Sequence, residues 1–220
     1  MLIVGVDTSG KHGGIALARA DGGQFTLIEA TEIAGGTFSA QLVPQLASLL
    51  KKHGASKEDI DGIAVASGPG SFTGLRVGLA AVKGLAEILH IPIVAISLLE
   101  AVVLATKQNG DFLAVLDAGR GEFYIGGYQV VGQVATLHGQ EELLSREELV
   151  RLASGRVVTP EAGLVELLSK SDVRVIDRPG AAAIAEIAVQ KLRAGITVPP
   201  EELDVNYIRR SDAEIFAKKP

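Results

Sequence analysis

The glycine-rich stretch Ser67–Gly78, SGPGSFTGLRVG, is the part of the sequence with the clearest potential for anion binding. Gly70 and its neighbours turn the chain, and a helix is expected to begin near Thr73. Free N–H groups at a helix start attract anions, and Arg76 would add positive charge. The stretch is not a phosphate-binding P-loop, because Gly74 is followed by Leu-Arg where that motif needs Lys-Ser or Lys-Thr. Spacing alone therefore favours a backbone turn over an anion site.

Two further loops combine an aspartate with small residues. Asp7 precedes Thr-Ser-Gly, and Asp117 stands before Gly119-Arg120. Each is typical of an ordinary Asx turn, yet together they could hold the phosphates and metal of a nucleotide between two lobes. Each loop has a single acidic residue, so nucleotide contact is left open and hydrolysis is disfavoured. The candidate anion or nucleotide contacts are Asp7, Ser9, Gly70, Arg76 and Asp117.

Residues for metal or nucleophilic chemistry are sparse. The chain has no cysteine, and its four histidines include no pair at the i, i+4 spacing of a zinc helix. Ser67 and Ser71 do not form the Gly-x-Ser-x-Gly nucleophile elbow. We therefore predict neither a catalytic residue nor a metal site.

Composition bounds the protein class. The 220 residues are 47% hydrophobic and 21% charged, which is typical of a folded globular chain. A net charge of -5 and only 4% aromatic residues disfavour independent RNA binding. The basic clusters Arg209-Arg210 and Lys218-Lys219 are interpreted as a solvated end. No apolar run approaches the roughly 20 residues of a membrane helix, and MLIVGVDTSG predicts a first strand rather than a signal peptide. We expect a cytoplasmic protein without membrane contact.

The elements that would position these residues follow from hydrophobic periodicity. Strands are predicted over residues 2–6, 15–18, 25–33, 61–66, 91–96, 112–116, 122–130 and 173–176. Helices are predicted over residues 39–53, 73–89, 97–107, 145–153, 161–169 and 181–194. Each half of the chain opens as strand, aspartate, tight turn and strand, which suggests two related α/β lobes. We place them at residues 1–109 and 110–220, with Asn109-Gly110 as the hinge.

The predicted helix over residues 73–89 is rich in small residues. It contains Gly74, Gly78 and Gly84 beside several alanines. Because glycine inside a helix costs about 1 kcal/mol relative to alanine, three glycines need a compensating reason. Close packing supplies one, either within the same lobe or against another subunit. The sequence leaves both alternatives open.

Four segments in order along the chain resemble the TsaB family, also called YeaZ. They are VDTS at Val6–Ser9, the Ser67–Gly78 stretch, DAGRGEFY at Asp117–Tyr124 and YIRRSDAE at Tyr207–Glu214. The resemblance implies a two-lobed actin-like fold of the sugar-kinase/Hsp70 type, with mixed sheets flanked by helices. It also implies a non-catalytic scaffold subunit in the formation of threonylcarbamoyladenosine on tRNA. The partners implied are a catalytic paralogue, TsaD, and an ATPase, TsaE.

The resemblance further places subunit association on the helices over residues 39–53 and 73–89. The metal-binding His-x-x-x-His helix of the paralogue is replaced here by FSAQL at Phe38–Leu42. A homodimer is expected when the paralogue is absent, tRNA contact only through the complex, and no tightly bound cofactor, with weak adenine nucleotide binding at the complex interface left open. The predicted interface residues are Leu42, Leu46, Leu75, Leu79 and Val82.

Two enzymatic alternatives remain at this point. One is an ATP-dependent phosphotransferase or carbamoyltransferase acting between the lobes. The other is a metallopeptidase, which the lack of paired histidines and of cysteine disfavours.

Overall fold

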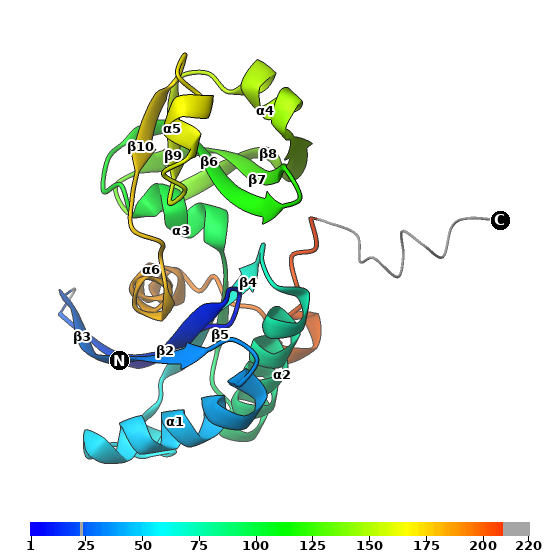
Figure 1. Ribbon diagram of the computed structural model, residues 1–220. Coiled ribbons are helices and arrows are strands. Elements are labelled where there is room, and N and C mark those ends of the chain that lie inside the picture. The colour runs from blue at the N-terminus through cyan, green and yellow to red at the C-terminus, as the bar shows by residue number, and fades with distance from the viewer. Residues whose placement is uncertain (23, 209–220) are drawn as a thin grey trace. The chain divides into compact units, whose positions relative to one another are not determined.

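The computed structural model describes residues 1–22 and 24–208, so the basic clusters Arg209-Arg210 and Lys218-Lys219 lie outside the described residues. The chain divides into two compact units (Figure 1). The first comprises Met1–Ala101 and Pro179–Val205, and the second comprises Val102–Arg178 and, among the described residues, 206–208. This division differs from the expected boundary at 109/110, because the chain returns to the first unit with a late helix that packs on its sheet.

The first unit is built on a five-stranded mixed sheet in the order β3-β2-β1-β4-β5. Strand β1 pairs antiparallel with β2 and parallel with β4, β2 pairs antiparallel with β3, and β4 pairs parallel with β5. The strands are β1 Leu2–Asp7, β2 His12–Asp21, β3 Gln24–Ala34, β4 Gly62–Gly68 and β5 Ile93–Ser97. The central position of β1 brings its end, Asp7, to the same edge of the sheet as the end of β4.

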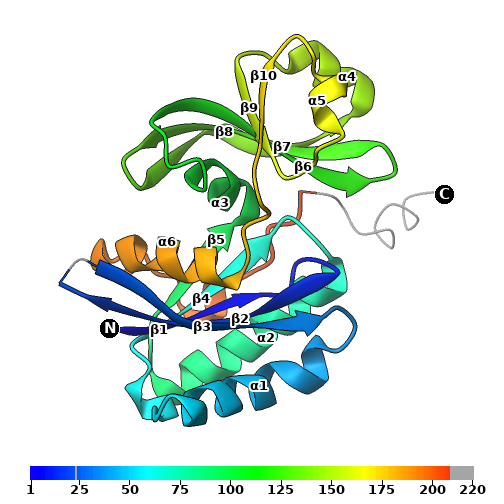
Figure 2. The same ribbon diagram turned by 60° about the vertical axis from the view of Figure 1, so that its left-hand side comes forward.

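Helices cover both faces of this sheet, as Figure 2 shows. Helices α1 (Phe38–Lys52) and α2 (Phe72–Leu89) lie on one face, and α6 (Ala181–Arg193) lies on the other. Helix α6 approaches β1 so closely that a Cβ on Gly5 would lie 2.2 Å from the carbonyl oxygen of Ala181. Two short 3-10 helices, η1 (Lys57–Asp59) and η2 (Pro200–Glu202), complete the unit.

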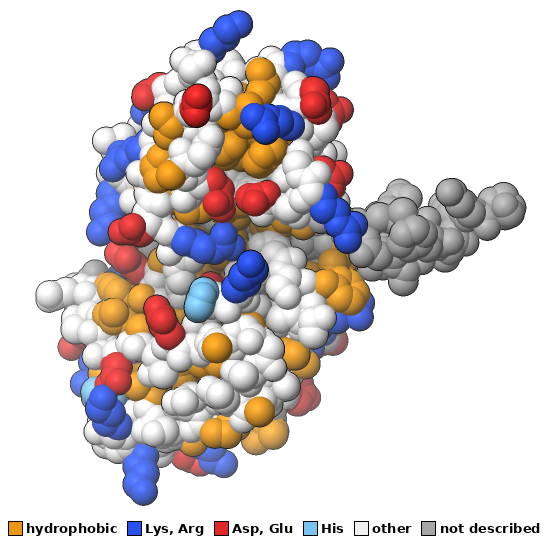
Figure 3. Space-filling model, viewed as in Figure 1, with side chains coloured by type: hydrophobic (Ala, Val, Ile, Leu, Met, Phe, Trp, Pro, Cys, Tyr) orange, Lys and Arg blue, Asp and Glu red, His pale blue; other side chains and the backbone are white. Residues whose placement is uncertain are grey.

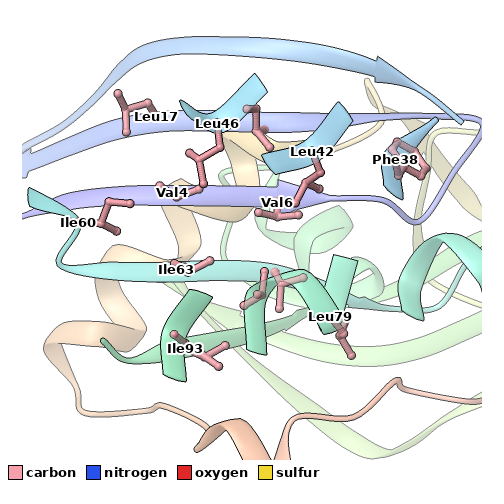
Figure 4. Packing of buried hydrophobic residues seen from close by; sticks show 14 of the residues in the cluster. Val4, Val6, Leu17, Phe38, Leu42, Leu46, Ile60, Ile63, Leu79 and Ile93 are labelled. Carbon is pink, nitrogen blue, oxygen red and sulfur yellow. The ribbon is translucent and has the colours of Figure 1, made fainter. Parts of the chain in front are cut away.

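The core of the first unit lies between the sheet and the α1–α2 layer (Figure 4). Every residue of β1 is buried, because the strand is covered on both faces. Figure 4 shows side chains of β1, β2 and β4 meeting those of α1 and α2, among them Val6, Leu42 and Leu79. Burial of this apolar surface fixes which side of each helix faces the sheet.

The second unit repeats the topology of the first. Its five-stranded sheet has the order β10-β9-β6-β7-β8, in which β6 takes the place of β1 with an antiparallel neighbour β7 and a parallel neighbour β9. The strands are β6 Gly110–Gly119, β7 Glu122–Val131, β8 Val134–Ser145, β9 Arg156–Thr159 and β10 Asp172–Val175. The helices are α3 (Leu98–Leu104), which begins in the first unit, α4 (Arg146–Leu152) and α5 (Leu164–Leu167). The predicted duplication and the actin-like class with mixed sheets are confirmed.

Some predicted elements differ from the observed ones. Strands β8 and β9 were not predicted, and the helices expected over 97–107 and 161–169 are shorter as α3 and α5. Ser145 does begin a helix, and it forms a capping box with Glu148. Within the described residues, no helix is both long and apolar enough to cross a membrane.

Candidate functional site

The loop between β1 and β2 docks against the first turns of α2. A Cβ on Gly74 would lie 2.1 Å from the carbonyl oxygen of Thr8, and a Cβ on Gly78 would lie 2.2 Å from its Oγ1. Thr8 is fully buried by this contact. The two glycines thus allow close packing within the lobe. Of the two alternatives that the sequence left open, packing within the lobe therefore applies to Gly74 and Gly78.

A hydrogen bond from the start of α2 holds the same loop. The Ser71 N–H donates to the carbonyl oxygen of Ser9 at 2.6 Å, and a Cβ on Gly70 would lie 2.4 Å from that oxygen. Ser71 also caps α2, since its hydroxyl accepts from the Gly74 N–H at 3.3 Å. The Ser67–Gly78 stretch therefore receives the β1–β2 loop, and the interpretation of the stretch as a backbone turn agrees with this geometry.

Aspartates at equivalent places in the two sheets make the same turn. Asp7 Oδ1 accepts from the Ser9 N–H at 2.9 Å, and Asp117 Oδ1 accepts from the Gly119 N–H at 2.8 Å. Asp7 is buried, whereas Asp117 is exposed. Each turn is the ordinary Asx turn expected from the sequence.

The anion candidates of the first unit lie at one edge of its sheet. Asp7 ends β1 and Ser9 lies in the loop that follows it. Gly70 packs against Ser9, and the Arg76 guanidinium lies 3.8 Å above the Phe72 ring on the first turns of α2. The hydroxyls of Thr8 and Ser9 are buried there and have no hydrogen-bond partner among the described residues. Asp117 belongs to the second unit. Thr8 was missed as a site residue, and anion binding remains a prediction.

No group of histidine, aspartate and glutamate side chains within the described part of the chain is arranged to hold a metal ion. A surface groove of about 720 Å³ contains none of the predicted site residues. Its lining is Arg19, Asp21, Gly22, Gln24, Thr26, Ile28 and His53.

The predicted interface residues are core residues, which corrects the sequence-based assignment. All five belong to the apolar cluster under α1 and α2, and none exposes more than 4% of its surface. The periodic leucine stripe of each helix faces the sheet, as amphipathic helices of globular proteins do. These side chains stabilise the lobe and have almost no surface left for a partner. They are Leu42, Leu46, Leu75, Leu79 and Val82.

The outward side of α2 carries a different stripe, which we call the α2 ridge: Ala80, Gly84 and Ile88. Their spacing of four residues places them on one side of the helix. Ala80 is exposed, Ile88 exposes 71% of its surface, and a Cβ on Gly84 would have no atom within 4 Å. No contact among the described residues therefore requires a glycine at position 84. The sequence contained this signal in the small residues opposite the leucine stripe.

The neighbouring outward side of α1 is also poor in charge. Helix α1 carries no charged residue before Lys51, and Val43 exposes 49% of its surface. In Figure 3 the surface over α1 is mostly uncharged. At the end of α1, Lys52 and His53 both bind Glu29 of β3, with nitrogen–oxygen distances of 2.7 Å. The hydrogen bond from Lys52, followed by that from His53, lowers the pKa of Glu29.

Comparison with known proteins gives consistent matches. The family model described as "TsaD: tRNA N6-adenosine threonylcarbamoyltransferase" matches residues 30–166. The Escherichia coli (strain K12) protein named "tRNA threonylcarbamoyladenosine biosynthesis protein TsaB" is 31% identical over 229 residues, covering 97% of this chain and 96% of that protein. The Bacillus subtilis protein of the same name is 38% identical over 130 residues, which cover 59% of this chain and 56% of that protein.

A solved structure has the same fold. The structure titled "YeaZ from Pseudomonas aeruginosa" superposes with a TM-score of 0.77 at 25% identity, covering 94% of this chain and 99% of that one. The E. coli relative aligns along nearly the full length of both chains, and its identity exceeds 30%. The chain therefore belongs to the TsaB (YeaZ) family.

Proposed function

We propose that this chain is a non-catalytic subunit in the formation of threonylcarbamoyladenosine on tRNA. Membership of the TsaB family supports the pathway. The observation that carries the proposal is the α2 ridge, where Ile88 exposes 71% of its surface and a Cβ on Gly84 would meet no described atom within 4 Å.

The partner is a TsaD-like catalytic paralogue that packs helices against the outward side of α1 and α2. Small residues such as Ala80 and Gly84 allow a second helix to approach closely, and Ile88 adds apolar area. A second copy of this chain occupies the same face when the paralogue is absent. The pair then recruits a TsaE-like ATPase. The net charge of -5 favours tRNA contact through the complex rather than through this chain.

Reconstitution tests the proposal. tRNA modification is measured with the paralogue and the ATPase, with and without this chain. We expect strict dependence on the chain and no turnover by the chain alone. Turnover by the chain alone, or full modification without it, would contradict the scaffold role.

A matched pair of variants tests the binding face. Ile88→Glu places a charge on the α2 ridge, and Leu152→Glu makes the same change at a residue of α4 that is 54% exposed. Only the Ile88 variant should lose co-purification with the paralogue and the modification activity. Equal behaviour of the two variants would refute the assignment of the face.

An ATP-dependent transferase is the second candidate, because the matching family model is named for a transferase. The Asx turn of Asp7 in the first unit would contact the adenine nucleotide. This candidate requires turnover by the purified chain and its loss in Asp7→Asn. Nucleotide binding without turnover, unaffected by the paralogue, would leave the scaffold proposal in place.

A further inference from the structure

The segment Val198–Val205, which we call the C-terminal strap, is an integral part of the first unit. It begins as an antiparallel bridge between Val198 and Ile93 on the edge strand β5. It continues as η2, which packs against α2. Leu203 and Val205 are then buried in the same apolar cluster as the leucines of α2. The strap is therefore held in place along its length.

The strap and α1 lie on opposite sides of α2. Helix α1 contacts β2 and β3, α2 contacts mainly β4, and the strap starts on β5. Because the sheet order is β3-β2-β1-β4-β5, the layer on this face runs α1, α2, strap. Figures 1 and 2 show the strap beside α2.

A helix seated on the α2 ridge would reach both neighbours of α2. Packed helices have axes about 8–10 Å apart, and a helix with side chains is about 10–12 Å wide. Because Ala80 and Gly84 have small side chains or none, the axis of the incoming helix can approach the axis of α2 to the shorter of these interaxial distances. Its flanking side chains then lie over α1 on one side and over the strap on the other.

The two flanks differ in chemistry. The α1 flank is uncharged before Lys51, whereas the strap exposes Glu201, Glu202 and Asp204. Within the described residues, Glu201 and Glu202 take part in no ion pair, and Asp204 bonds only to the N–H of Val205. These carboxylates therefore favour a partner surface that carries cations.

We propose that the strap is the second half of the partner-binding face and that the TsaD-like paralogue places lysine or arginine side chains against it. This inference rests on the proposed function, because the paralogue is its occupant. Charges at the rim of an interface act mainly on the association rate, and salt screens them over about 8–10 Å. The strap carboxylates thus accelerate docking, while the α2 ridge supplies the apolar contact.

Charge reversal of the strap tests this inference. The double variant Glu201→Lys/Glu202→Lys leaves the buried Leu203 and Val205 intact. Glu166→Lys/Asp172→Lys makes the same change of charge at exposed residues of the second unit. Association with the purified paralogue is measured at about 50 and 200 mM salt, where screening differs strongly, and thermal melting verifies that both variants fold.

We expect the strap variant to associate at least about 10-fold more slowly at low salt and to lose the salt dependence of the wild-type rate. The second-unit variant should behave as wild type. A strap variant with the wild-type rate and salt dependence overturns the inference and leaves the proposed function standing. A wild-type chain that fails to bind the paralogue overturns the proposed function itself.

Discussion

The hydroxyl of Thr8 lies where a side chain on Gly78 would have to be. A Cβ at that position would stand 2.2 Å from Thr8 Oγ1, far inside ordinary contact distance, whereas a Cβ on Gly84 would meet nothing within 4 Å. Gly78 and Gly84, both in α2, thus occur for different structural reasons. Gly78 makes room for the β1–β2 loop, and Gly84 leaves the outward surface of α2 open to a partner.

Replacing each of these glycines with alanine separates the two reasons. Both changes gain the same helix propensity, about 0.5–1 kcal/mol. Gly84→Ala should show this gain in the free energy of unfolding, measured with urea. The free energy of unfolding of Gly78→Ala should be about 1–3 kcal/mol lower than that of Gly84→Ala, because the added methyl group overpacks the contact with Thr8.

A double-mutant cycle identifies the atom responsible. Thr8→Ala removes the Oγ1 that the new methyl group would strike, so Thr8→Ala/Gly78→Ala should be more stable than the sum of the single changes. Additive effects, or equal stability of Gly78→Ala and Gly84→Ala, would show that the loop does not dock as described.

The leucine stripe of α2 should respond as a core and not as an interface. Leu79→Ala is expected to lower the free energy of unfolding by about 2–5 kcal/mol, because Leu79 is packed in the main cluster. Ile88→Ala, at an exposed position of the same helix, should change it by less than about 0.5 kcal/mol. Denaturant unfolding of the two variants checks this. Similar costs for both would mean that Leu79 is not buried in solution.

The same contrast shows where sequence reasoning succeeded. Hydrophobic periodicity located α1, α2 and α6 within a few residues, because each helix has an apolar stripe that faces a sheet. The paired strand, aspartate and turn patterns predicted the duplication that β1–β2 and β6–β7 display. Both signals are local, so the sequence alone carried them.

Other features depend on which surface another element covers. Strand β8 is an edge strand whose residues are mostly exposed, so its sequence lacks an apolar alternation. Leu42 and Leu79 looked available to a partner because periodicity finds an apolar stripe without revealing what covers it. The return of α6 and the strap to the first unit is likewise a long-range contact that no local pattern records.

Gly84→Ala should also weaken partner binding while it stabilises the free chain. The added methyl group would separate two closely packed helices, so we expect a loss of affinity for the TsaD-like paralogue of about 10-fold or more, which corresponds to about 1.4 kcal/mol. Titration calorimetry with the paralogue measures it. An unchanged affinity would show that no helix approaches Gly84.

The contact of Glu29 with Lys52 and His53 should make part of the stability depend on acid pH. Hydrogen bonds from Lys52 and then His53 lower the pKa of Glu29 in the folded chain. Such a carboxylate adds stability that is fully present above its unfolded pKa and is lost as pH falls through the lower, folded pKa.

Glu29→Gln removes this contribution, so the variant should have a lower unfolding free energy than the wild type at neutral pH. The deficit should then shrink as the pH falls below the usual range of a glutamate. Because these side chains are partly exposed, salt should reduce the deficit as well. Glu87→Gln, an exposed change on α2 without an ion pair among the described residues, serves as the control in the same urea titrations. A deficit for Glu29→Gln that is independent of pH would mean that the charge of Glu29 does not hold the end of α1 to β3.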